Sequence, residues 1–168
     1  MGMRILTASP KTSRHLTPAE VSNKSLYFKP DRSIGYLLRD CSRHFSKELE
    51  AKIRPYGILI GQWFFLRELW QEDGLIQASL STRVGMKAPT TNVAIRRMVE
   101  DGLVIRKQDT ADRRKVKIYL TKKGRRLRDE LLPLAFEVNE TATKGFSQKE
   151  VRQFQSLIDR MKKNLTSD

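Results

Sequence analysis

The sequence predicts a mainly α-helical protein with one small β-hairpin, which is an α+β fold. From Ile34 onwards, apolar residues recur at steps of three and four, as they do on the buried side of a helix. Proline or glycine interrupts this pattern at positions 55, 57, 85, 89 and 102 and separates the helices. Between 103 and 120 the apolar period becomes two on both sides of a polar turn, which predicts the hairpin.

The first two helices are expected over 34–53 and 59–72. The first ends before Pro55 and has one apolar face, made of Ile34, Leu37, Leu38, Cys41, Phe45, Leu49 and Ile53. The second is apolar on more than one face, so we expect it to be deeply buried; its apolar residues include Trp63, Phe64, Leu66, Leu69 and Trp70.

Two shorter helices follow, over 77–84 and from Pro89 to Asp101, with Gly85 between them. Proline suits a first helical turn because its missing N–H needs no partner there. The second helix has a small or apolar face of Thr91, Ala94, Ile95 and Met98. After the hairpin, Thr121 caps a long helix that Pro133 should kink, and Ser147 with Glu150 forms the capping box of the last helix. Helix, turn, helix and hairpin in this order predict a winged helix-turn-helix.

The positive charge is concentrated in one part of the chain. The 168 residues include 33 Lys and Arg against 19 Asp and Glu, a net charge of +14. Residues 74–126 hold 14 basic and 4 acidic side chains, whereas 34–73 and 127–168 are each neutral. A basic segment between two neutral segments indicates a polyanionic partner, most often nucleic acid.

Several other classes of protein are disfavoured. The chain has no run of about 18 apolar residues that would span a membrane, and no apolar segment of signal-peptide length at its start, so we expect a cytoplasmic protein. One cysteine and two histidines offer little for a disulfide framework, a metal site or a nucleophile–base pair. With no phosphate loop or dinucleotide motif either, we expect no enzyme activity, no cofactor and no metal.

The charge and the predicted elements together indicate duplex DNA. A short helix would brace a second helix whose small first side chains approach base edges in the major groove, while the hairpin tip reaches the minor groove. Hydroxyl, amide and guanidinium groups can bind phosphates or bases. The expected contacts are Pro89, Thr90, Thr91, Asn92, Val93, Arg96, Arg97, Asp112, Arg113, Arg114 and Lys115. An ordinary α+β fragment with a solvated basic face would share this pattern.

Residues 80–124 resemble the multiple-antibiotic-resistance regulator (MarR) family of bacterial transcription factors, and the helix order extends the resemblance to about 34–165. The resemblance is carried by Val84-Gly85-Met86, Pro89-Thr90-Thr91, Glu100-Asp101-Gly102-Leu103-Val104, Asp112-Arg113-Arg114 and Leu120-Thr121-Lys122-Lys123-Gly124, with Gln62-Trp63 upstream. The family often has a hydroxyl residue capping the helix over 77–84, where this chain has Ile76.

The resemblance implies a homodimer on a palindromic operator, with the first and the last two helices intertwined. It places a recognition helix in the major groove and a wing arginine in the minor groove, and it implies an ion pair at Asp112 that holds the wing. The alternative reading of Asp112 is a simple turn former. The terminal helices could instead pack only on the core of their own chain. We therefore expect an N-terminal arm over 1–33, flexible or loosely packed, a helical dimerisation region over 34–58 and 121–168, and a DNA-binding lobe over 59–120.

Such regulators commonly respond to aromatic anions or to oxidants. Cys41 lies on the apolar face of its helix, which is typical of a small core residue and disfavours oxidant sensing. A phenolic or aromatic carboxylate ligand could meet Arg39, Arg43, His44, Trp63 and Phe64, although surface arginines and core aromatics explain the same residues. We expect a sequence-specific double-stranded DNA-binding transcriptional regulator, a repressor released by a small ligand. The alternatives are a nonspecific architectural DNA-binding protein and a basic winged-helix module for protein or RNA contacts.

Overall fold

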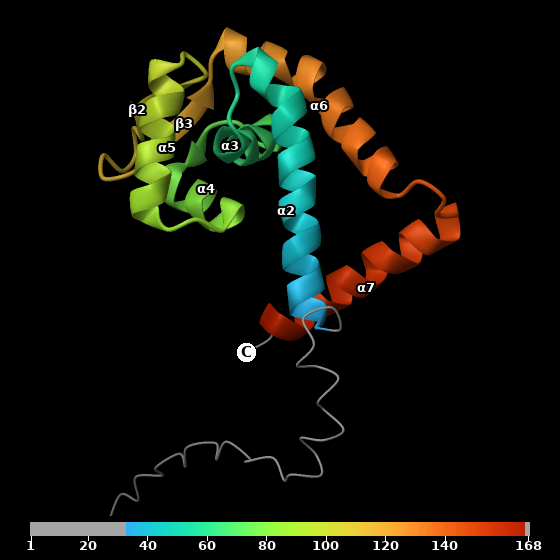
Figure 1. Cartoon of the computed structure of the whole chain (residues 1–168). Coiled ribbons are helices and arrows are strands. Elements are labelled where there is room, and N and C mark those ends of the chain that lie inside the picture. The colour runs from blue at the N-terminus through green and yellow to red at the C-terminus, as the bar shows by residue number, and fades with distance from the viewer. Residues whose placement is uncertain (1–32, 167–168) are drawn as a thin grey trace, which may run out of the picture. The chain divides into compact units, whose positions relative to one another are not determined.

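A computed structural model describes residues 33–166 of the chain. This part contains six α-helices, a short 3-10 helix and three short strands (Figure 1). The mainly helical α+β fold with a small hairpin is therefore confirmed. The arm expected over 1–33 lies, apart from Ser33, outside the described residues. The chain divides into two compact units at Arg43 and His44, within the first helix of the described part.

The first helices end where the local sequence signals predict. Helix α2 spans Ile34–Ile53 and is followed by the 3-10 turn η2, Arg54–Tyr56, after which Gly57 adopts a left-handed φ of 74°. Helix α3 spans Ile60–Gln71, and the Gln62 side chain accepts a hydrogen bond of 3.0 Å from the backbone N–H of Leu59. The expected deep burial of α3 is confirmed, because Trp63, Phe65, Leu66 and Leu69 are almost fully buried.

The sheet of the described residues has three antiparallel strands rather than the two that were expected. Its order is β1-β3-β2, with β1 at Leu75–Ile76, β2 at Val104–Gln108 and β3 at Val116–Leu120. The extra strand β1 pairs Leu75 with Ile118 and Ile76 with Lys117. Two residues are too few to show an alternating period, so only the tertiary structure reveals this strand.

Helix α4, Gln77–Val84, starts directly after β1, and α5, Ala88–Glu100, follows Gly85. Ile76 gives α4 no side-chain cap. Helix α6, Lys122–Ala142, is capped as predicted by the Thr121 hydroxyl, which accepts from the backbone N–H of Gly124 at 3.0 Å. Helix α7, Gln148–Thr166, begins at the predicted capping box: Glu150 accepts from the Ser147 N–H at 2.7 Å.

The core surrounds α3, and side chains from most of the other elements of the described part converge on it. The fully buried large residues are Trp63, Phe65, Ile53, Ile58, Leu66, Leu69, Leu80, Ile95, Met98, Leu103, Ile118 and Leu131. Helix α7 contributes no buried residue. Among the described helices, none is long and apolar enough to cross a membrane.

Cys41 is the clearest departure from the expected core. The sequence placed it among buried residues, but it is exposed in the single chain, and Ile34, Leu37 and Leu38 of the same helix are exposed as well. An apolar period identifies the face of a helix that avoids water, but it does not identify what covers that face. The prediction of a core cysteine is therefore wrong for the isolated chain.

Candidate nucleic-acid interface

Helices α4 and α5 are joined by a short turn at Gly85 that is closed by hydrogen bonds. Gly85 has a φ of 72°, a left-handed conformation that favours glycine. Behind the turn, the Ser81 hydroxyl donates to the carbonyl oxygen of Met86 at 2.6 Å and lies 2.9 Å from the Thr91 hydroxyl. Leu80 and Ile95 are fully buried beside this pair. The turn therefore fixes the angle at which α5 leaves α4, and it presents the outer face of α5 in one orientation.

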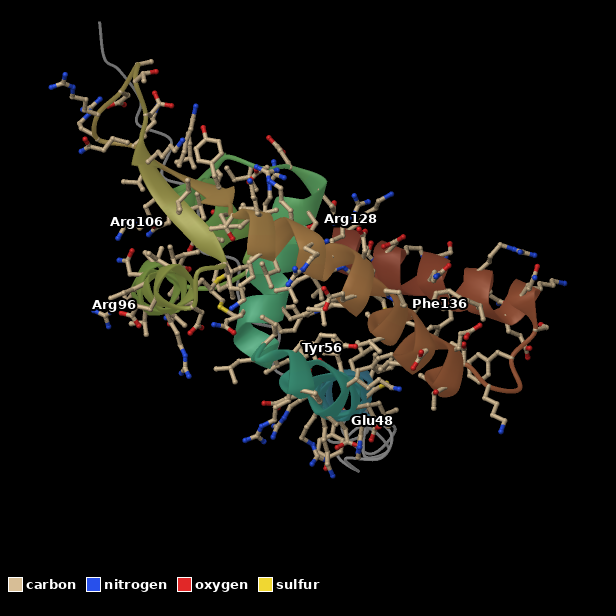
Figure 2. The ribbon with its side chains drawn as sticks, turned by 90° about the horizontal axis from the view of Figure 1, so that it is seen from above. Glu48, Tyr56, Arg96, Arg106, Arg128 and Phe136 are labelled. Atoms are coloured by element: carbon tan, nitrogen blue, oxygen red, sulfur yellow. The ribbon has the colours of Figure 1, made fainter. Side chains whose placement is uncertain are left out.

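The outer face of α5 carries most of the residues expected to contact DNA. Its exposed members are Pro89, Thr90, Asn92, Val93, Arg96 and Arg97. Val93 is 58% exposed and lies among these polar side chains. Figure 2 shows Arg96 of α5 and Arg106 of β2 on the same side of the molecule. The exposed face thus combines short polar side chains near the start of α5 with arginines one turn later.

Thr91 is a correction to the predicted interface. It is fully buried, and its hydroxyl is engaged with Ser81 rather than free to reach a phosphate or a base. Its spacing from Ile95 and Met98 places it on the inner face, which the helical period already indicated. The prediction of Thr91 as a DNA contact, based on its hydroxyl, is wrong; Thr91 instead holds α5 against α4.

Asn92 has a partner that the sequence did not reveal. The side-chain Nε2 of Gln77, the first residue of α4, donates a hydrogen bond to Asn92 Oδ1. The Gln77 Oε1 atom is buried and has no hydrogen-bond partner among the described residues. Two amides from the two helices of the motif are therefore in direct contact at the exposed face.

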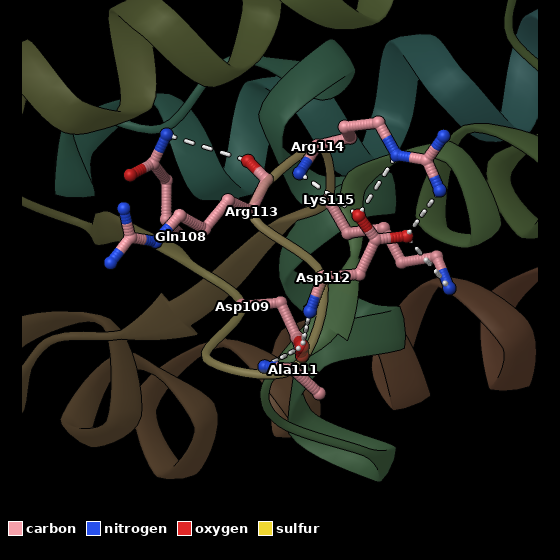
Figure 3. A network of polar contacts seen from close by, with 7 residues as sticks. All are labelled: Gln108, Asp109, Ala111, Asp112, Arg113, Arg114 and Lys115. Atoms are coloured by element: carbon pink, nitrogen blue, oxygen red, sulfur yellow. Dashed lines mark hydrogen bonds and ion pairs between the residues drawn. The ribbon is translucent and has the colours of Figure 1, made fainter.

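Asp109 organises the tip of the wing, the hairpin formed by β2 and β3. Its Oδ1 accepts from the backbone N–H groups of Ala111 at 2.9 Å and Asp112 at 3.0 Å (Figure 3). Its Oδ2 lies 2.6 Å from Lys117 Nζ. The hydrogen bond from Lys117 and the two backbone N–H groups lower the pKa of Asp109 to about 2. The sequence by itself indicates only a polar turn at this position.

Asp112 forms the ion pair that the family resemblance implied, and it also shapes the turn. Its Oδ1 accepts from the backbone N–H and the Nε of Arg114, both at 3.1 Å, and its Oδ2 accepts from Arg114 Nη2 at 3.3 Å (Figure 3). Lys115 Nζ lies 3.5 Å from the same carboxylate. The Arg114 hydrogen bond is the main cause of a lowered Asp112 pKa. The Arg114 side chain is nevertheless 92% exposed, so it is tethered without being covered.

Arg113 is held differently from Arg114. Its carbonyl oxygen accepts from Gln108 Nε2 at 3.5 Å, but within the described part of the chain no hydrogen bond or ion pair engages its exposed guanidinium. The wing tip therefore offers one oriented arginine and one unrestrained arginine to a ligand.

Asp73 anchors the base of the wing, a role that its neighbours in the sequence do not indicate. Its Oδ1 accepts from the backbone N–H of Leu120 at 2.8 Å, and its Oδ2 lies 2.6 Å from Arg125 Nη2. These contacts tie the end of α3 to β3 and to α6. These partners of Asp73 lie about 50 residues further along the chain, so no local sequence pattern indicates the contact.

The residues expected to bind a small ligand are found in different environments. Arg39 and Arg43 are exposed on α2, where Arg43 Nη2 pairs with Asp40 Oδ1 at 2.6 Å. His44 is exposed, and Phe64 is 40% exposed. Trp63 is only 1% exposed and contacts Trp70 edge to face, with ring centroids 5.6 Å apart, so it is a core aromatic. A pocket formed by the other residues stays a prediction.

Comparison with known proteins identifies the family to which this fold belongs. The family model described as MarR family matches residues 59–116. The fold superimposes with a TM-score of 0.74 on a crystal structure of a MarR transcriptional regulator from Methanosarcina mazei Go1, which is 34% identical; the match covers 78% of this chain and 94% of that one. The chain belongs to the MarR family.

Two further relatives agree with a role in transcription and DNA binding. The organic hydroperoxide resistance transcriptional regulator of Bacillus subtilis (strain 168) is 25% identical over 114 residues, which cover 68% of this chain and 78% of the relative. The structure of an S. aureus MepR-DNA complex is 25% identical, with a TM-score of 0.73 and coverage of 79% of this chain and 98% of the other. This MarR-family protein is therefore a transcriptional regulator, and its α4, α5 and wing form the winged helix-turn-helix.

Proposed function

We propose that this regulator binds a palindromic site in double-stranded DNA as a homodimer, with α5 in the major groove and the wing tip in the minor groove. The observation that carries the proposal is the exposed, basic surface shared by α5 and the wing. It presents the exposed side chains of Arg96, Arg97, Arg113 and Arg114. The MepR structure, which is a complex with DNA, supports DNA as the partner.

The dimer is proposed because the chain leaves large apolar side chains uncovered. Phe136 is 62% exposed, and α7 exposes Phe154 at 49%, Leu157 at 41% and Leu165 at 85%. Monomeric proteins rarely expose contiguous apolar faces of this kind. These side chains lie within residues 127–168, which have no net charge. A neutral surface suits an interface between two copies of the chain. Two-fold symmetry would then place two α5 helices about one turn of DNA apart, on a palindromic operator.

Selection of binding sites from a random duplex library tests this function, followed by fluorescence anisotropy on the selected site. We expect a palindromic consensus, and Arg113→Ala should weaken binding to all sequences and lower the slope of log affinity against log salt by about 1. Arg67→Ala, an exposed arginine of α3, is the control and should leave the slope unchanged. Equal affinity for all duplexes would indicate a nonspecific architectural DNA-binding protein. Preferential binding of RNA or of a protein would indicate a basic winged-helix module for protein or RNA contacts.

We further propose that the regulator is a repressor and that an aromatic carboxylate or phenol releases it. Exposed Arg39, Arg43 and His44 would supply cationic or polar groups, and half-exposed Phe64 an aromatic surface. A ligand can release DNA only by binding more tightly to a state that does not fit DNA. A thermal-shift screen of aromatic acids against the protein and its Phe64→Ala variant tests this, followed by anisotropy with each acid that stabilises the protein. If no acid both raises the melting temperature and lowers DNA affinity, this part of the proposal is wrong.

A further inference from the structure

The contact between Gln77 and Asn92 joins the first residue of α4 to the outer face of α5. We propose that Gln77 is a positioning residue for base recognition: it fixes the amide of Asn92 so that the Nδ2 amino group, rather than the carbonyl oxygen, is the group presented to DNA. This inference rests on the proposed function, in which α5 enters the major groove. It adds a residue outside α5 and the wing to those that determine sequence preference.

The direction of the hydrogen bond decides which end of the Asn92 amide is free. Gln77 Nε2 donates and Asn92 Oδ1 accepts, so the oxygen of Asn92 is turned toward α4. The Nδ2 group occupies the other arm of the planar amide and therefore points away from Gln77. Within the described residues Nδ2 has no hydrogen-bond partner of its own. Its two N–H groups are left for a ligand.

The burial of the Gln77 Oε1 atom favours this orientation over the reverse. In the present orientation, the buried atom without a partner is a carbonyl oxygen, Gln77 Oε1. Turning the amide by half a revolution would bury both N–H groups of Nε2 instead. Unpaired buried N–H groups are rarer in proteins than under-used carbonyl oxygens. Gln77 is also held at its backbone, because it directly follows β1, which pairs with β3.

A fixed amino group selects for bases that offer an acceptor. In the major groove, guanine and adenine present N7 and thymine presents O4, whereas cytosine presents only the N4 donor group. An unrestrained asparagine could rotate its oxygen outward and accept from cytosine; an asparagine held by Gln77 cannot do so without losing that hydrogen bond. We therefore expect cytosine to be excluded from one symmetric position of each half-site, on the strand that Asn92 contacts.

Three variants test the assignment in the full-length chain by site selection from a random duplex library. Gln77→Ala should release the amide, so that discrimination against cytosine at that position falls at least about fivefold, the loss typical of one mismatched contact. Gln77→Glu replaces the donor by a carboxylate that accepts from Asn92 Nδ2, which turns Oδ1 outward and shifts the preference toward cytosine or adenine. Asn92→Asp should shift the preference in the same direction, because Gln77 still donates to one carboxylate oxygen while the other faces the base.

The matched control is Ala78→Glu, which adds the same negative charge one residue further along α4. It should weaken binding to all duplexes and leave the base preference unchanged. A readout without DNA is the side-chain amide exchange of Gln77 by NMR, which should be slow in the wild-type protein and fast in Asn92→Ala. Circular dichroism checks that each variant is folded. If the Gln77 variants unfold, the base preference of Asn92→Asp tests the assignment by itself.

The two proposals fail in different ways. If the wild-type protein selects a palindromic site but Gln77→Glu and Asn92→Asp leave its base preference unchanged, the positioning role is wrong and the proposed function stands. If Gln77 amide exchange is equally fast in wild-type and Asn92→Ala protein, the positioning role is also wrong. If the wild-type protein shows no sequence preference at all, both proposals are wrong.

Discussion

Gly124 and Leu103 approach each other so closely that no side chain fits between them. A β carbon on Gly124 would lie 2.2 Å from the carbonyl oxygen of Leu103, in the backbone that leads into β2. The Thr121 hydroxyl donates to the Gly102 carbonyl at 2.7 Å, and the Thr121 N–H donates to the Leu103 carbonyl at 3.0 Å. The motif from Leu120 to Gly124 is thus the point where α6 contacts the base of the wing.

This approach predicts that Gly124→Ala lowers the free energy of unfolding by at least about 1–3 kcal/mol, the usual cost of overpacking. The backbone of Leu103 must move, because a carbonyl cannot rotate away as a flexible side chain can. Guanidinium unfolding at a fixed protein concentration measures the change. Gly61→Ala in α3 is the control: nothing lies within 4 Å of its added β carbon, and it should stabilise the helix by up to about 1 kcal/mol. Equal stability of the two variants would contradict the prediction.

Adjacent threonines in α5 should have opposite roles. Thr91→Val removes a buried hydroxyl that contacts Ser81, so we expect a loss of about 1–2 kcal/mol in unfolding free energy with unchanged base preference. Thr90→Val removes an exposed hydroxyl, so stability should change by less than about 0.5 kcal/mol while DNA affinity falls. Chemical denaturation and anisotropy on the same preparations separate the two effects. A larger loss of affinity in Thr91→Val than in Thr90→Val would refute this division.

Asp112 should strengthen DNA binding in spite of its negative charge. Asp112→Ala removes an acidic group near DNA, which by charge alone would raise affinity, but it also releases the Arg114 side chain from its two hydrogen bonds and the Arg114 backbone N–H from a third. Because Arg114 would then have to be ordered on binding, we expect affinity to fall about fivefold. The control is Asp129→Ala, which removes the same charge from an exposed position of α6 and should not weaken binding. Tighter binding by Asp112→Ala would show that orientation of Arg114 is unimportant.

The wing tip should keep Asp109 ionised in mild acid. Its folded pKa of about 2 is below the ordinary value of 3.8, so its contribution to stability is complete above the ordinary pKa and is lost as the pH falls toward 2. The carboxyl chemical shift of Asp109, followed by NMR, measures this pKa. Lys117→Met removes the hydrogen bond that lowers the Asp109 pKa most, so the pKa of Asp109 should rise in this variant. Lys115→Met is the control, because Lys115 pairs with Asp112 instead. The same titration curve in Lys117→Met and wild-type protein would contradict this origin.

The apolar face of α7 should control the oligomeric state. Phe154→Asp places a charge at a side chain that is 49% exposed in the single chain, and we expect it to convert the proposed dimer to a monomer and to weaken operator binding. Sedimentation velocity measures the mass. Gln155→Asp, at an exposed polar position one residue away, should leave the dimer intact. A monomeric wild-type protein at micromolar concentration would overturn the proposed dimer itself.

Local sequence signals predicted the helix boundaries because helices start and stop by chemistry within a few residues. Gly85 ends α4, and Ser147 with Glu150 starts α7, where the sequence placed them. The same reasoning failed for β1, which is too short to show a period, and for Cys41, whose helix face is uncovered in the single chain. For Thr91, two sequence signals disagreed: its spacing from Ile95 and Met98 indicated the buried face of α5, whereas its hydroxyl suggested a DNA contact. The structure agrees with the spacing.

The sequence by itself determined the order of the elements, the basic block over 74–126 and the residue types of the wing tip, because these depend on composition and on neighbours along the chain. Only the tertiary structure decided which polar groups hold one another. Gln77 meets Asn92 and Asp73 meets Leu120 across turns and strands, at sequence separations that no periodic pattern records. Such contacts depend on packing of the core around α3, which places distant segments of the chain next to one another.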